Sequence, residues 1–230
     1  MQTKGLPLQS LTLFDAILFD MDGTLVDTEP LWLLSERELM SRFGYDWTST
    51  DQANCLGGPL DRVGEYMHLL AGRAESGPYF TQALISLMVE KLHLGAELTE
   101  GASELMAMCV SLGIPMALVS ASPRIIVDAV LENLSPHEFT ISVSSNDVQE
   151  TKPNPEGYLQ AADYLQVSIS RCLILEDSKT GVAAAEASGA CVVAIPHLVE
   201  IAETSRVKII SSLKELNLEK MRALFSDWSG

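Results

Sequence analysis

The chain has 230 residues, 47% of them hydrophobic and 20% charged, so it can bury a substantial core in one large domain or two smaller ones. Its 31 acidic residues outnumber its 15 basic ones, which gives a formal net charge of -16. Such a charge repels nucleic acid and anionic membrane surfaces, so we expect neither as a partner. An anionic ligand must then be held by a local site.

The opening stretch "MQTKGLPLQSLTLF" contains one Lys, a Pro and no small-residue cleavage site, so it does not read as a secretory signal. The four cysteines show no CxxC spacing, and three of them lie in apolar runs, where reduced cysteine packs as a small hydrophobic residue. We therefore expect a cytoplasmic protein, with a monomer as the default state.

The first predicted strand is the apolar run "AILFD" at residues 16–20. The next, "PMALVS" at 115–120, comes almost 100 residues later, although a crossover between parallel strands needs only about a dozen. Between them, apolar residues recur near the helical period. We predict a helical domain inserted at residues 29–98, while residues 1–28 and 99–230 form the core. The helical patterns of the insertion cover residues 30–44, 59–73 and 79–95.

Later strands are predicted at 171–177 and 191–196, with a weaker one from Val207. Each is a nearly continuous apolar run, which indicates a strand covered by helices on both faces. Strand and helix alternate, so the predicted fold class is α/β: a doubly wound parallel sheet with a second, smaller α-helical domain. The core helices are expected at residues 103–112, 123–134, 154–165 and 179–188.

An uncharged stretch at residues 105–123 is about long enough to cross a bilayer. Gly113 and Pro115 divide it into a helical half and a strand half, which is typical of a helix packed on a sheet. We therefore expect no membrane span.

Polar residues follow the predicted strands, and in an open parallel sheet the ligand binds beyond the carboxyl ends of the strands. Clustered carboxylates raise one another's pKa unless a cation joins them, and oxygen ligands suit Mg²⁺ better than Zn²⁺. Together with a lysine and hydroxyl groups they predict metal-assisted phosphoryl transfer. The residues are Asp20, Asp22 and Thr24, Ser120 and Ser122, Lys152, and Glu176 and Asp177.

Four motifs in the same order resemble the haloacid dehalogenase-like superfamily: "DMDGTL" from Asp20, "LVSAS" at Ser120, "TKPNP" at Lys152 and "LEDSKTG" at Glu176 and Asp177. They extend over most of the chain. The residues in these motifs are most similar to those of the branch of β-phosphoglucomutase-like sugar-phosphate phosphatases with a helical cap. The resemblance implies that the cap closes over the site, excludes bulk water and contributes the specificity contacts.

The resemblance also implies a role for each motif residue. Asp20 would attack phosphorus and become an aspartyl phosphate, while Asp22 would protonate the leaving oxygen and then activate water. An acid at position 22 disfavours dehalogenation, because carbon–halogen hydrolases of the superfamily lack one there. Ser120, Ala121 and Lys152 would bind the phosphoryl oxygens. Mg²⁺ would be held by Asp20, the backbone carbonyl of Asp22 and Asp177, with Glu176 in or just outside the first coordination shell.

These residues predict a Mg²⁺-dependent phosphatase of a small phosphorylated metabolite, a sugar or sugar-alcohol phosphate. A phosphosugar mutase remains an alternative, because both reactions begin with the aspartyl phosphate. A non-catalytic phosphate-binding or regulatory module is a further alternative, although binding alone would not require both Asp20 and Asp22.

Several other polar residues have a structural interpretation that we favour. Ser122 is at least as well explained as a helix cap, and Asp27 and Glu29 as the hinge into the inserted domain. Arg62 and Arg124 could meet a second anionic group, but surface charge is the commoner role. Trp32 is expected in a core rather than stacked on a ligand. The histidines, which show no metal-ligand spacing, are His68, His93, His137 and His197.

Overall fold

The computed structural model describes residues 13–55, 59–196 and 199–229. His197 and nearly all of the opening stretch lie outside these residues. Contacts within the chain define two compact units. The first takes in the described residues up to Leu25, Leu98–Ala121 and those from Glu138 onward, and the second takes in Val26–Glu97 and Ser122–His137.

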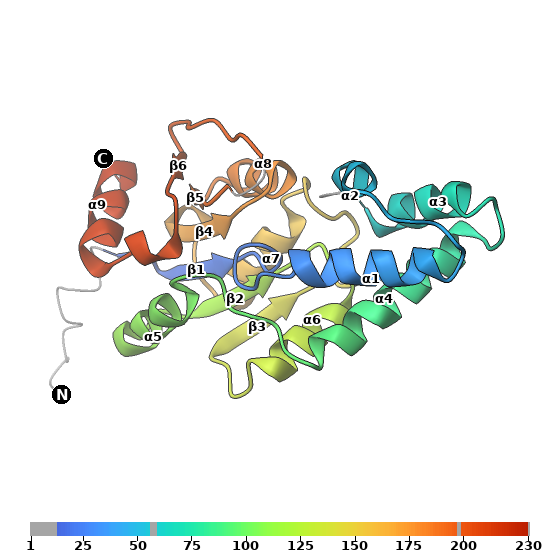
Figure 1. Ribbon diagram of the computed structural model, residues 1–230. Coiled ribbons are helices and arrows are strands. Elements are labelled where there is room, and N and C mark those ends of the chain that lie inside the picture. Colours follow the sequence, from blue (N-terminus) through green and yellow to red (C-terminus); the bar gives the residue numbers. More distant parts are fainter. Residues whose placement is uncertain (1–12, 56–58, 197–198, 230) are drawn as a thin grey trace, which may run out of the picture. The chain divides into compact units, whose positions relative to one another are not determined.

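The first unit is built on a sheet whose six described strands pair in parallel, in the order β3-β2-β1-β4-β5-β6 (Figure 1). Strand β1 lies near the middle, with Leu18 opposite Ala117 of β2 and Ile174 of β4. The predicted parallel α/β fold class is confirmed. The strands are β1 (Ala16–Phe19), β2 (Met116–Val119), β3 (Phe139–Val143), β4 (Cys172–Glu176), β5 (Cys191–Ala194) and β6 (Val207–Ile209).

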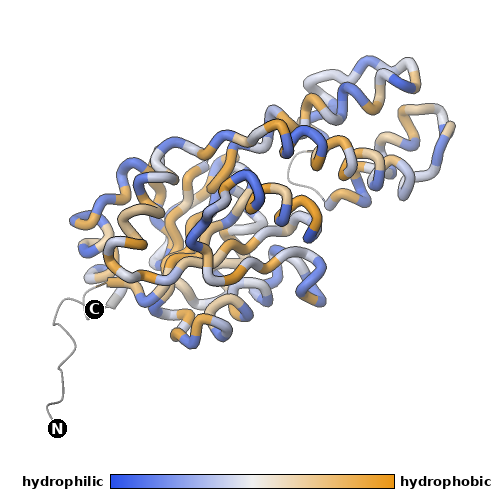
Figure 2. The backbone as a smooth tube through the Cα atoms, turned by 90° about the horizontal axis from the view of Figure 1, so that it is seen from below, coloured by the Kyte–Doolittle hydropathy of each residue, from blue (hydrophilic) through white to orange (hydrophobic). Residues whose placement is uncertain are grey.

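The four inner strands of the sheet are almost entirely apolar, which agrees with helices that cover them. All the side chains of β1, β2, β4 and β5 are buried, and these strands run as hydrophobic segments through the sheet in Figure 2. Tyr158 and Ala161 of α7 pack on one face together with Ala184 and Ala185 of α8. The helices of this unit are α5 (Ala102–Leu112), α7 (Glu156–Tyr164), α8 (Lys179–Ser188) and α9 (Leu218–Ser229), with short turns η2 (Ile169–Arg171) and η3 (Leu213–Glu215).

The second unit is helical and has its own apolar core, in which Leu39, Trp47, Met67 and Phe80 are buried together. Its members include α6, whose Asn133 Nδ2 donates a hydrogen bond to the carbonyl oxygen of Leu92 at the end of α4. Our proposal for the domain boundaries remains a core of residues 1–28 and 99–230 with an insertion at 29–98; it differs from the units defined by contacts in assigning α6 to the core. The helices are α1 (Glu29–Ser41), α2 (Ser49–Cys55), α3 (Leu60–Leu70), α4 (Gly77–Leu92) and α6 (Arg124–Asn133).

Apart from the short turns η2 and η3, strand β3 and helices α2 and α9 were not predicted from the sequence. Strand β3 lies at the edge of the sheet and alternates apolar with polar residues, among them the exposed Thr140, so it lacks the continuous apolar run of the inner strands. Helix α2 has only seven residues, "STDQANC". In helix α9 the buried Met221, Leu224 and Phe225 are interspersed with charged and polar residues.

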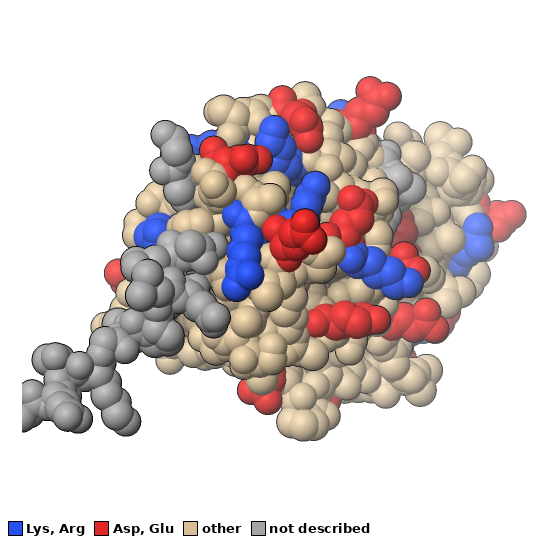
Figure 3. Space-filling view, turned by 90° about the vertical axis from the view of Figure 1, so that its left-hand side faces the viewer, with Lys and Arg blue, Asp and Glu red and all other residues tan. Residues whose placement is uncertain are grey.

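The face of the molecule drawn in Figure 3 carries charges of both signs. On the face shown in Figure 3, the described Lys and Arg side chains alternate with Asp and Glu, so neither sign forms a continuous area there. None of the helices in the described part of the chain combines the length and apolar character that a membrane span requires.

Glu36 is a buried acid in the core of the second unit, and its carboxylate accepts a hydrogen bond from Trp47 Nε1 at 3.0 Å. Burial, with a smaller contribution from the charge of Glu29, raises the pKa of Glu36 from 4.5 to about 7 despite that bond. The folded protein therefore holds this proton more tightly than the unfolded chain. Stability from this group is present below about pH 4.5 and is lost as the pH rises through about 7.

Replacing Glu36 with Gln is expected to stabilise the protein at pH 8 by roughly 2–3 kcal/mol and to change little at pH 4.5, because Gln accepts the Trp47 bond without a buried charge. Thermal unfolding followed by circular dichroism at both pH values measures this. Glu90→Gln, at an exposed position of α4, is the matched control. An equal gain at both pH values would contradict the explanation.

Candidate active site

The first site element is the turn that leaves β1. The Asp20 N–H donates to the Leu175 carbonyl at 3.0 Å, so this residue still follows the sheet, and its side chain is buried. Gly23 then adopts a φ of 79°, and a Cβ atom there would overlap the Asp177 carboxylate. Glycine is thus required at position 23 for two reasons: the positive φ, and the close approach of the Asp177 carboxylate.

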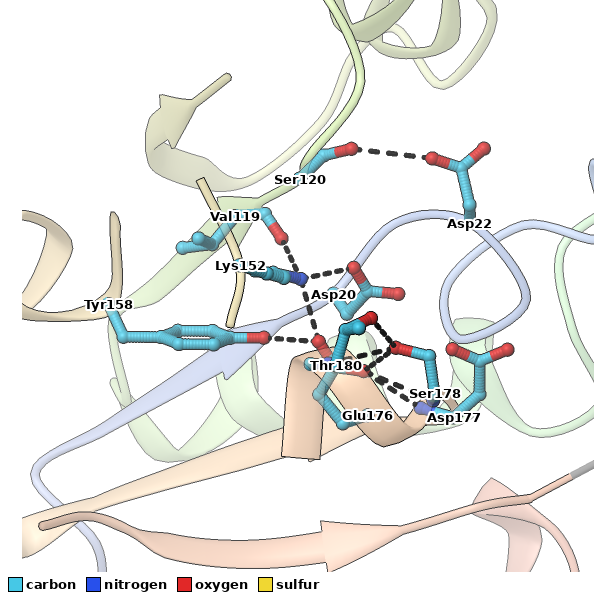
Figure 4. Close-up of polar contacts among 11 residues, drawn as sticks. Asp20, Asp22, Val119, Ser120, Lys152, Tyr158, Glu176, Asp177, Ser178 and Thr180 are labelled. Atoms are coloured by element: carbon cyan, nitrogen blue, oxygen red, sulfur yellow. Dashed lines mark hydrogen bonds and ion pairs between the residues drawn. The ribbon is translucent and has the colours of Figure 1, made fainter. Parts of the chain in front are cut away.

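Lys152 lies at the centre of the polar contacts (Figure 4). Its Nζ donates to Asp20 Oδ1 at 2.5 Å, to Glu176 Oε1 at 2.7 Å and to the Val119 carbonyl at 2.9 Å. All three ammonium hydrogens therefore have acceptors. Burial alone would lower the Lys152 pKa, but the charges of Asp20 and Glu176 outweigh it and raise that pKa. The side chain is a permanent buried cation between two acids.

The loop that carries Lys152 is held by its own hydrogen bonds. Glu156, at the start of α7, accepts from the backbone N–H groups of Gln149 and Glu150, both at 2.9 Å. Asn154 Oδ1 in turn accepts from the Glu156 N–H at 2.9 Å. These bonds fix the chain on both sides of Lys152.

Glu176 ends β4 and is fully buried. Its Oε2 accepts from Ser178 Oγ at 3.1 Å and from the Asp177 N–H at 3.1 Å, while Ser178 also caps α8 by accepting from the Gly181 N–H. A Cβ atom on Gly181 would overlap the Glu176 carboxylate. The small residues at the start of α8 thus leave room for an acid beneath the helix.

Three carboxylates form a cluster that can hold a cation: oxygen atoms of Asp20, Glu176 and Asp177 lie within 4.8 Å of one another. Burial first, and then the charge of Glu176, raises the pKa of Asp20 to about 7, although Lys152 opposes the shift. Burial and the charges of Asp20 and Glu176 raise the pKa of Asp177 to about 9. Oxygen ligands that repel one another in this way suit a hard divalent cation.

Asp22 and Ser120 lie beside each other, and Ser120 Oγ donates to Asp22 Oδ2 at 3.3 Å (Figure 4). Ser120 directly follows β2 and its N–H donates to the Val143 carbonyl, while the next residue, Ala121, is exposed. The Asp22 carboxylate is not a member of the three-acid cluster found among the described residues.

Thr24 is buried, and its carbonyl accepts from Thr99 Oγ1 at 2.5 Å. Its own hydroxyl has no hydrogen-bond partner among the described residues. Thr24 therefore joins the two segments of the first unit that flank the insertion, rather than the acidic cluster.

The remaining predicted candidates belong to the second unit. Arg62 donates to the Asn54 carbonyl at 2.8 Å, and Arg124 pairs with Asp128 on α6 at 3.2 Å. Trp32 packs against the helical core. The others in this unit are Asp27, Glu29, Ser122, His68, His93 and His137.

Tyr158 was not singled out from the sequence. It is buried on α7, donates to Glu176 Oε1 at 2.7 Å and lies beside Lys152 (Figure 4). Its position in a helical pattern six residues after Lys152 predicted only a helix. Its hydrogen-bond partner, Glu176, lies on β4, which is distant in the sequence.

The fold and the site define a hydrolase with a parallel α/β core and an acidic cluster at the carboxyl ends of β1 and β4. The chain belongs to the haloacid dehalogenase-like hydrolase family, which it matches over residues 17–195. The resemblance seen in the four motifs is thereby confirmed, as is the expectation of an enzyme.

Individual relatives support this membership. Hexitol phosphatase B of Escherichia coli (strain K12) is 31% identical over 186 residues, which are 79% of this chain and 83% of that protein. The bifunctional riboflavin kinase/FMN phosphatase of Arabidopsis thaliana is 30% identical over 228 residues, 94% of this chain but only 58% of that protein. A family IA, variant 3 hydrolase of Entamoeba histolytica HM-1:IMSS shares the fold, with a TM-score of 0.81 at 24% identity over 92% of this chain and 99% of that one.

Proposed function

We propose that the chain is a Mg²⁺-dependent phosphatase of a small phosphorylated metabolite, a sugar or sugar-alcohol phosphate, and that it acts through an aspartyl phosphate on Asp20. One observation carries the proposal: Lys152 Nζ lies between Asp20 and Glu176, at 2.5 and 2.7 Å, in the midst of the acidic cluster. Fixed positive charge at this place favours a group that gains negative charge, as phosphoryl oxygens do. The name of hexitol phosphatase B supports the substrate class.

In the first step, an Asp20 carboxylate oxygen bonds to phosphorus while the ester P–O bond breaks, and Asp22 gives its proton to the departing alkoxide. In the second step, water attacks phosphorus, Asp22 takes the proton from that water, and the bond to Asp20 breaks. Free phosphate leaves, and both aspartates return to their starting states. Ser120, whose hydroxyl contacts Asp22, and Ala121 would bind phosphoryl oxygens together with Lys152.

The residues that would hold Mg²⁺ are Asp20, Asp177 and the backbone carbonyl of Asp22, with Glu176 beside them. When bound, the ion supplies positive charge that neutralises the phosphoryl oxygens. The raised pKa values of Asp20 and Asp177 support this assignment, because burial and the mutual repulsion of the carboxylates favour their protonated forms, and a divalent cation that binds there would relieve the repulsion and displace the protons.

The activity is tested by phosphate release from an aryl phosphate, followed by a screen of phosphorylated sugars, polyols, glycolate and nucleotides. We expect release with Mg²⁺ and turnover that is fastest with a sugar or polyol phosphate. Product analysis decides between a phosphatase and a mutase, since a mutase returns the phosphoryl group to the sugar. If phosphate is released from none of these compounds, the proposal is contradicted.

Removal of divalent metal gives a second test, in which the unfolding measurement needs no substrate. Mg²⁺ at about 100 times its dissociation constant should stabilise the fold by about 2.7 kcal/mol, because it binds only the folded cluster. Thermal unfolding with Mg²⁺ and with EDTA measures this, and phosphate release should stop in EDTA and resume when Mg²⁺ is restored. The same unfolding curve under both conditions would contradict a metal site.

We also propose a cytoplasmic location and a monomeric state, with no nucleic acid or membrane as partner. The reducing compartment is supported by the four cysteines, all of which are buried and free.

A further inference from the structure

The Tyr158 hydroxyl is a buried polar group that donates a hydrogen bond to Glu176. Its side chain is 1% exposed, and the hydroxyl donates to Glu176 Oε1 at 2.7 Å. A buried hydroxyl without an acceptor is costly, whereas phenylalanine would fill the same space without needing one. We therefore expect the hydroxyl to act on the acid that it contacts, Glu176.

The acceptor oxygen is shared. Glu176 Oε1 accepts both from Tyr158 and from Lys152 Nζ, each at 2.7 Å, so its two lone pairs are occupied. The other oxygen, Oε2, is held by Ser178 and by the backbone N–H of Asp177. The carboxylate is thus held from both sides, and Tyr158 supplies the neutral donor on the side of Lys152.

Tyr158 also contacts the cation itself, because Lys152 Nζ lies 5.0 Å from the centroid of the ring. That distance is within the range of a cation–π interaction. One side chain therefore contacts both members of the Lys152–Glu176 ion pair, through the ring and through the hydroxyl (Figure 4).

We propose that Tyr158 is a positioning residue of the site: through Glu176 Oε1 it fixes the carboxylate that faces Asp20 and Asp177, and so raises the affinity of this cluster for a divalent cation. The inference deepens the proposed function and rests on its assignment of the metal site. Hydrogen-bond partners that orient metal ligands typically contribute about 10–100-fold to metal affinity or activity.

The test is Tyr158→Phe, which keeps the ring and removes only the hydroxyl. We expect the dissociation constant for Mn²⁺, measured by electron paramagnetic resonance on purified protein, to rise about 10-fold. The concentration of Mg²⁺ that gives half-maximal phosphate release should rise in parallel, while kcat at saturating Mg²⁺ changes much less. Tyr164→Phe is the matched control, because Tyr164 is on the same helix and is 61% exposed.

A double-mutant cycle shows whether the hydroxyl acts through Glu176. In a Glu176→Ala background, Tyr158→Phe should change the Mn²⁺ affinity by no more than about 2-fold, because the acceptor of the Tyr158 hydroxyl is already absent. A loss as large as in the wild-type background overturns the proposal, and so does a folded Tyr158→Phe variant that binds Mn²⁺ as the wild type does.

If the Tyr158→Phe variant does not fold, NMR on the wild-type protein tests the proposal instead. With ¹³C-labelled tyrosine rings, the NMR signals of Tyr158 should shift when Mg²⁺ is added and those of Tyr164 should not. Unmoved Tyr158 signals overturn the proposal. A wild-type protein that binds Mn²⁺ but releases no phosphate overturns the proposed function alone, since the effect of Tyr158 on metal affinity would stand.

Discussion

Asp20→Asn is expected to lower the rate of phosphate release at least about 1,000-fold, because an amide cannot replace the attacking carboxylate. The fold should survive, since Asn is nearly the same size and its carbonyl can still accept from Lys152. The variant should be at least as stable as the wild type at pH 8, because it no longer buries a carboxylate whose pKa is raised to about 7. Phosphate release and thermal unfolding measure the two effects separately.

The matched control for this variant is Asp163→Asn, at an exposed position on α7, which should retain wild-type turnover. Rapid acid quenching during turnover should trap one phosphoryl group on the wild-type protein and none on Asp20→Asn. If the Asn variant keeps the wild-type rate, Asp20 is not the nucleophile.

Lys152→Met should affect both activity and stability. Phosphate release should fall about 100–1,000-fold, because a fixed positive charge beside the phosphoryl group is lost. The protein should also lose about 3–5 kcal/mol of stability, since removing one partner of a buried ion pair leaves the acids Asp20 and Glu176 without compensation. Phosphate release at saturating Mg²⁺ and denaturant unfolding are the measurements.

Two further variants sharpen this test. Lys179→Met removes an exposed lysine at the start of α8 and should change neither quantity appreciably. Lys152→Arg keeps the charge but should restore little, because a planar guanidinium does not reproduce the three contacts of a compact ammonium group with Asp20, Glu176 and Val119. Full activity in Lys152→Met would contradict the role given to this residue.

The fold class could be predicted from the sequence because its signals are local. A strand buried on both faces requires a nearly continuous apolar run, and "AILF" and "CLILE" meet that requirement within a few residues. Strand β3 could not be found in this way, because an edge strand carries polar residues on its open side. The membership of α6 in the helical unit was equally hidden, since it depends on packing against α4 rather than on the pattern of α6 itself.

The sequence by itself also determined the chemical content of the site. Carboxylates at the carboxyl ends of apolar strands belong at one edge of a parallel sheet, so Asp20, Glu176 and Asp177 could be grouped from the sequence alone. Tertiary structure alone decided how they are held: Lys152 reaches Asp20 across 132 positions of the chain, and Tyr158 binds Glu176 from a helix on one face of the sheet. The physical reason is that strand ends follow from local hydrophobicity, whereas the partner of a buried polar group depends on which distant elements pack beside it.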